Sequence, residues 1–96
     1  MENPPKVVVI EITPELARSH KYSDTQDCPA YHAARNAGLS VMSVGGHYLR
    51  CGWIGPFYKF GQSFTISDVE RIAQSNESFY MTLIPCRLED LNAPTK

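Results

Sequence analysis

The sequence lacks any run of apolar residues long enough to cross a membrane, which takes about 20 residues in a helix. The apolar run at residues 7–10 is too short, and wrongly flanked, for a signal peptide. A strong charge of one sign is also missing, because the formal net charge is -1. A nucleic-acid binder needs a basic surface. We therefore expect a cytoplasmic protein with neither a membrane nor a nucleic-acid partner.

Cysteine is scarce, and its spacing suggests no bridging or metal-binding pattern. The three residues Cys28, Cys51 and Cys86 are an odd number and contain no C-x-x-C pair. A disulfide framework favours an even number, and a structural zinc site favours a close ligand pair. A zinc site built from His20, Cys28, His32 and Cys51 is disfavoured for the same reason. We therefore expect free thiols, no bound metal and no cofactor.

Length and composition predict one small folded domain. The chain has 96 residues, of which 43% are hydrophobic and 20% charged, as in ordinary globular proteins. No internal repeat or low-complexity segment is present. We expect a single domain over residues 1–96 with flexible ends at about residues 1–5 and 89–96. A core of this size is modest, so a homodimer would add stability.

The clearest local signal is a central helix between Asp27 and Gly38. Asp27 can accept hydrogen bonds at the helix N-terminus, Pro29 suits the first turn, and Gly38 suits the left-handed position after the last turn. Helical spacing predicts a smooth packing face and an opposite, working face. The packing face holds Ala30, Ala33, Ala34 and Ala37, and the opposite face holds Cys28, Tyr31, His32 and Arg35.

The other elements follow from β-branched runs, turn residues and helix caps. We expect strands at residues 6–12, 39–44, 47–53 and 79–84, the last ended by Pro85, and helices at 14–20 and 67–76. Gly45-Gly46 predicts a type I′ hairpin turn, and Ser67 with Glu70 predicts a capping box. The order indicates an α+β fold, with a small, mainly antiparallel sheet of four or five strands. Two short helices and the central helix should pack on one face.

Residues 53–61 read as an aromatic loop, with at most a short strand, because glycines and Pro56 interrupt it. Aromatic side chains grouped with cations are typical of protein-binding hot spots. They are also typical of a small core. The partner-binding candidates are Arg50, Trp53, Phe57, Tyr58, Lys59 and Phe60.

Two other sites are weaker. Cys28 and His32 share a helix face, as a nucleophile and its base could, but Asp27 opposes thiolate formation and we expect no catalysis. A small ligand or nucleotide could instead use the N-terminus of the central helix. Its candidate residues are Lys21, Cys28, His32 and Arg35.

Several stretches resemble a loose group of short accessory proteins encoded by bacteriophages and prophage-bearing bacteria. They are T-P-E-L at residues 13–16, D-C-P-A-Y-H-A-A-R at 27–35, the glycine hairpin and F-Y-M-T-L-I at 79–84. The resemblance implies a phage-type protein that works inside the host bacterium. We therefore expect a non-catalytic binding or inhibitor protein that engages a host protein, such as a component of an antiviral defence system. The ligand-binding protein and the cysteine-dependent enzyme are the alternatives.

Overall fold

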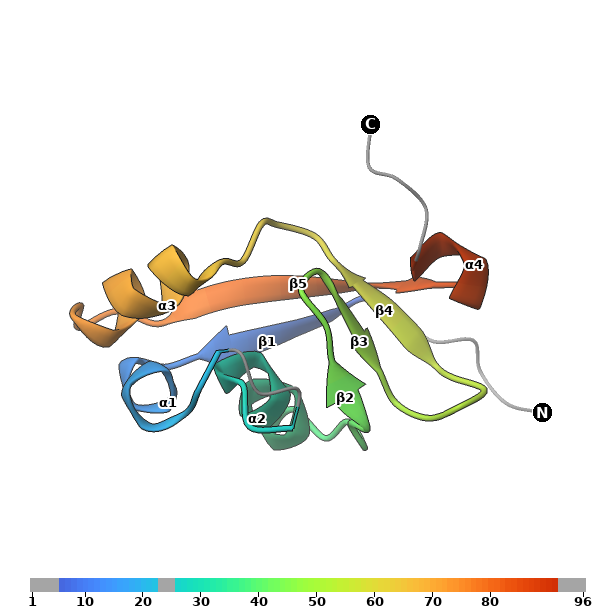
Figure 1. The fold of residues 1–96 in the computed structure, drawn as a ribbon, viewed down its shortest axis with the longest axis horizontal. Helices are drawn as coiled ribbons and strands as arrows, with labels where there is room; N and C mark the ends of the chain where they lie inside the picture. Colours follow the sequence, from blue (N-terminus) through green and yellow to red (C-terminus); the bar gives the residue numbers. More distant parts are fainter. Residues whose placement is uncertain (1–5, 23–25, 92–96) are drawn as a thin grey trace.

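The computed structural model describes residues 6–22 and 26–91, which form a twisted five-stranded sheet and four helices (Figure 1). All strand pairs are antiparallel and the spatial order is β1-β5-β4-β3-β2. The elements along the chain are β1 (Val8–Ile12), α1 (Pro14–Ser19), α2 (Pro29–Asn36), β2 (Ser43–Val44), β3 (Tyr48–Arg50), β4 (Phe57–Phe60), α3 (Ile66–Ala73), β5 (Phe79–Cys86) and α4 (Leu88–Leu91). The expected α+β class is confirmed. None of these helices has the length and apolar character that a membrane crossing requires.

One face of the sheet forms the core with α1, α2 and α3. Alternation along β1 buries Ile10 and Ile12 and leaves Val9 and Glu11 exposed, as the two-residue period of a strand requires. Helix α2 packs on β1, and α3 packs on α1 at the end of the sheet where β1 ends and β5 begins (Figure 1). The largest fully buried side chains are Ile10, Ile12, Pro29, Leu49, Met81 and Leu83.

The first two helices lie where the caps predicted them, with one correction at the second. Thr13 caps α1, since its hydroxyl accepts from the amide of Leu16 at 3.1 Å. Helix α2 begins at Pro29 and its N-cap is Cys28, without a side-chain cap bond. The predicted Asp27 cap is therefore wrong, because its carboxylate contacts two histidines instead. Ala30, Ala33 and Ala34 are buried as expected, but so is Cys28, and Ala37 is exposed.

The third helix begins earlier than its predicted cap. Thr65 and Asp68 form the capping box of α3: the amide of Thr65 donates to Asp68 at 2.8 Å, and the Thr65 hydroxyl accepts from the Asp68 amide at 3.4 Å. The predicted Ser67–Glu70 box is wrong because α3 has already started at Ile66. The sequence contains two possible capping boxes, Thr65–Asp68 and Ser67–Glu70, and the helix begins at the first.

Strand lengths differ most from expectation. Only Ser43–Val44 of the predicted strand 39–44 is paired as β2, opposite Arg50 and Leu49 of β3. The β2–β3 hairpin forms, but neither Gly45 nor Gly46 has positive φ, so the expected type I′ turn is wrong. Within the predicted aromatic loop at residues 53–61, residues 57–60 form β4, which lies between β5 and β3 in the sheet. Pro85 does not end the last strand as predicted, because β5 continues to Cys86. The β1–β5 pairing stops at Leu83, so no residue of β1 needs the N–H that Pro85 lacks.

The ends of the chain are described only in part. Residues 1–5 and 92–96, for which we expect flexibility, lie outside the described residues. The beginning of the predicted C-terminal tail instead forms the helical turn α4, which packs against β4.

Candidate functional site

The turn between β3 and β4 carries the most exposed large apolar side chains of the described residues. Backbone bonds close it, from the amide of Cys51 to the carbonyl of Pro56 at 3.0 Å and from the amide of Gly55 to the carbonyl of Gly52 at 3.3 Å. Gly55 has a φ of 101°, a conformation that favours glycine. Trp53 and Ile54 lie between these bonds and are 75% and 97% exposed. The turn thus presents two large apolar residues on a backbone that is closed at its base.

The side chain of Arg50, the last residue of β3, lies against the Trp53 ring. Its guanidinium carbon lies 5.5 Å from the Trp53 ring centroid and 5.4 Å from that of Phe57, so the cation lies within cation–π distance of both rings. The Nε of Arg50 is buried without a hydrogen-bond partner, and Arg50 makes no ion pair with the described residues. We call Arg50, Trp53 and Ile54 the hairpin tip. The hairpin tip combines two exposed apolar side chains with a cation that lies against the Trp53 ring.

The structure separates the other partner-binding candidates from this tip. Tyr58 points into the core, opposite Leu49, and is 3% exposed, so a partner cannot reach it. Phe57 is also buried, beside Arg50 on the outer face, while Lys59 and Phe60 are half-buried. Sequence reasoning missed Ile54, although an isoleucine between a tryptophan and a glycine in a broken segment was a usable signal.

The outer face of the sheet continues the apolar surface away from the tip. Cross-strand partners share a face, so Lys59 lies beside Ile84, and Val9 beside Thr82. Val9, Tyr80 and Ile84 are exposed on this face. These three side chains lie on β1 and β5, whereas the hairpin tip joins β3 to β4.

The expected cysteine–histidine pair is not assembled as a nucleophile and base. Cys28 is 2% exposed, and a substrate could not reach its thiol. The Nε2 of His32 instead lies 2.9 Å from Oδ1 of Asp27, which also lies 2.8 Å from Nδ1 of His20. The two imidazole rings stack with centroids 3.7 Å apart. Hydrogen bonds from His32 and then His20 lower the pKa of Asp27 below its ordinary value of 3.8.

The other thiols are not activated either. Burial raises the pKa of Cys51, and burial followed by the Asp90 carboxylate raises that of Cys86. A nucleophilic cysteine needs the opposite shift. The catalytic alternative therefore has no geometric support at any of the three cysteines.

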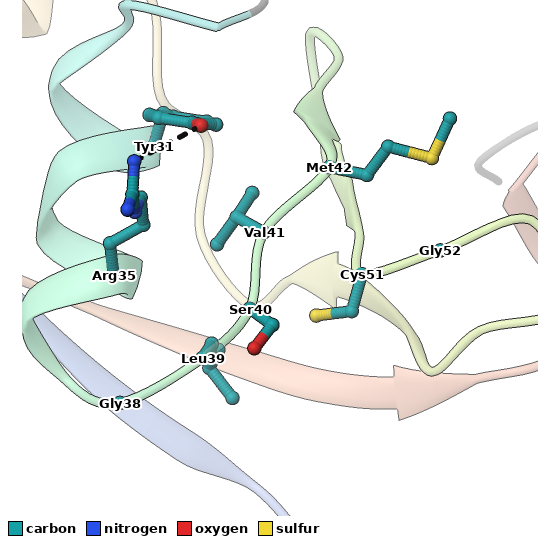
Figure 2. A pocket seen from close by; sticks show the side chains of 9 residues that line it. All are labelled: Tyr31, Arg35, Gly38, Leu39, Ser40, Val41, Met42, Cys51 and Gly52. Carbon is teal, nitrogen blue, oxygen red and sulfur yellow. Dashed lines mark hydrogen bonds between the residues drawn. The ribbon is translucent and has the colours of Figure 1, made fainter.

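The ligand-binding alternative is divided between two places. Lys21 is exposed, while Arg35 lies in the last turn of α2, about 10 Å along the helix from Cys28 at 1.5 Å per residue. Arg35 instead lines a pocket of about 590 Å³ together with Tyr31, whose hydroxyl accepts from Nη1 at 3.5 Å. Figure 2 shows residues 39–42 and Cys51 across from these two side chains. The four expected residues therefore do not form one site.

Comparison of the chain with protein-family models, curated proteins and solved structures finds no match.

Proposed function

We propose that the chain is a non-catalytic binding protein that engages another protein through the hairpin tip. The exposure of Trp53 and Ile54 carries this proposal, because two large apolar side chains at one turn expose area that the fold of the described residues does not cover. Tryptophan and arginine are the residue types most enriched at hot spots. The tip places one of each in contact.

The chemistry of the tip specifies the partner surface. Trp53 and Ile54 fit an apolar pocket on the partner, and the positive charge of Arg50 lies beside Trp53. Lys59, on the same outer face, adds positive charge and makes no ion pair with the described residues. The partner is therefore a protein with an apolar pocket and an acidic rim. The resemblance to short phage-encoded proteins suggests a host protein, such as a component of an antiviral defence system.

The test compares capture by the wild type with capture by Trp53→Ala. Affinity purification from bacterial lysate, followed by mass spectrometry, should identify a protein retained by the wild type and lost with the variant. With that protein purified, Trp53→Ala should weaken binding by about 2 kcal/mol or more, as hot-spot truncations do. Light scattering of the chain alone separates this heterologous contact from a homodimer that covers the same tip.

Tyr80→Ala is the matched control, since it removes another exposed aromatic far along the sheet from the tip. Both variants should melt close to the wild type, because surface substitutions usually change stability by no more than about 0.5 kcal/mol. Equal capture by the wild type and by folded Trp53→Ala would refute the proposal. So would a concentration-dependent dimer that Trp53→Ala converts to a monomer.

A further inference from the structure

Three metal-ligating side chains from two helix ends converge on one point. His20 is the C-cap residue of α1, Asp27 precedes α2, and His32 lies in its first turns. One atom of each, Nδ1, Oδ1 and Nε2 respectively, lies within 4.8 Å of the other two. The carboxylate oxygen is already in contact with both imidazoles, at 2.8 and 2.9 Å.

The donor set is one that divalent transition metals accept. Two imidazole nitrogens and one carboxylate oxygen hold zinc in several enzymes, with a fourth position left for water. A carboxylate only accepts hydrogen bonds, so the two nitrogens that face Asp27 carry hydrogens here. When a cation binds, each neutral imidazole would carry its hydrogen on the other ring nitrogen, and the three facing atoms would then be the ligands.

The two nitrogen–oxygen separations need only a small adjustment to suit a metal ion. Tetrahedral zinc with ligand bonds near 2.1 Å places neighbouring donor atoms about 3.4 Å apart. The two nitrogen–oxygen separations therefore have to widen by roughly half an ångström, a change that small rotations of partly exposed side chains can supply. The side chains of His20, His32 and Asp27 are 24%, 29% and 41% exposed, so an ion from solvent can reach them.

Asp27 contacts the two histidines in place of capping α2. An aspartate before a helix usually bonds a free amide of the first turn, and such a cap stabilises the helix. Asp27 makes no such bond to α2, and the N-cap residue Cys28 supplies none. The carboxylate is instead held between two histidines whose rings stack at 3.7 Å.

We infer that His20, Asp27 and His32 form a binding site for a divalent transition-metal ion of the zinc type. The site differs from the zinc set considered from the sequence, because neither Cys28, which is buried, nor Cys51 belongs to the cluster. It lies on α1 and α2, apart from the hairpin tip, so it is independent of the proposed protein partner.

Calorimetric titration of the whole chain with Zn²⁺ tests the inference. One equivalent should bind with micromolar affinity, and Asp27→Asn and His32→Ala should each weaken binding at least about tenfold, since even outer-shell partners contribute that much. Asp27→Asn keeps an oxygen acceptor for both histidines, so it should stay folded if His32→Ala does not. His47→Ala is the control, because it removes an exposed histidine from the β2–β3 turn.

Substitution with Co²⁺ identifies the ligands by absorption. The inferred site should give visible d–d bands without the near-ultraviolet charge-transfer band of a cobalt–thiolate bond. A thiolate band, the absence of saturable Zn²⁺ binding at millimolar concentration, or undiminished affinity in folded Asp27→Asn would each overturn the inference. Equal weakening by His47→Ala would overturn it as well.

Discussion

Replacing Ala34 by leucine tests how closely α2 approaches the sheet. Ala34 is 0% exposed on the face of α2 that packs on β1, so the added isopropyl group has no solvent to enter. Forcing extra carbon atoms into a packed core costs about 1–3 kcal/mol. At about 4–8 °C per kcal/mol for a domain of this size, the melting temperature should fall by about 4–24 °C.

Ala37→Leu, at the C-cap of the same helix, is the control. Ala37 is exposed, so leucine there should change stability by no more than about 0.5 kcal/mol. Alanine and leucine are both strong helix formers, so the difference between the two variants isolates packing from helix propensity. Thermal unfolding followed by circular dichroism measures both. A wild-type melting temperature for Ala34→Leu would refute close packing of α2 on the sheet, and an equal fall in both variants would assign the effect to the helix itself.

Two further predictions concern charge and thiols. The pKa of Asp68 lies below its ordinary value of 3.8, because the Arg71 side chain and then the Thr65 amide donate to its carboxylate. The ionised carboxylate therefore stabilises the fold above pH 3.8, and this stabilisation is lost as the pH falls through the lowered pKa. The wild type should therefore melt above Asp68→Asn at neutral pH, and a gap in melting temperature that persists at about pH 2 would contradict this linkage. Alkylation of the native protein, read by peptide mass spectrometry, should label Cys28 more slowly than Cys51 or Cys86, because only Cys28 is fully buried. Preferential labelling of Cys28 would reopen the catalytic alternative.

Local signals predicted the elements whose ends are fixed by neighbouring residues. Thr13 with Pro14 defines the start of α1 in the sequence and in the structure, because a cap bond spans only three residues. The same reasoning failed at Asp27, since its carboxylate has competing partners, and one of them, His20, lies seven residues earlier. A residue's own neighbours therefore predict what it can cap, while the fold decides which bond it makes.

The candidate sites also depend partly on local sequence and partly on contacts that the fold decides. The composition around Trp53 indicated an interface or a core. In the structure Tyr58 belongs to the core, whereas Trp53 is exposed. That outcome depends on the pairing of β4 with β5, whose residues come about two dozen positions later. The histidine cluster depends likewise on how α1 lies beside α2. Neither arrangement has a local sequence signature.

The position of β5 between β1 and β4 has a consequence for how the protein is made. Strands β2, β3 and β4 follow one another and can pair as each emerges from the ribosome, but β1 has no strand partner until β5 has been synthesised. Ile10 and Met81, which pair in the finished sheet, are 71 positions apart, so closing this contact carries a large chain-entropy cost. Until then the backbone edge of β1 that pairs with β5 stays open, and an unpaired strand edge is vulnerable to aggregation. A pause or truncation before β5 would thus leave two unjoined fragments of a sheet.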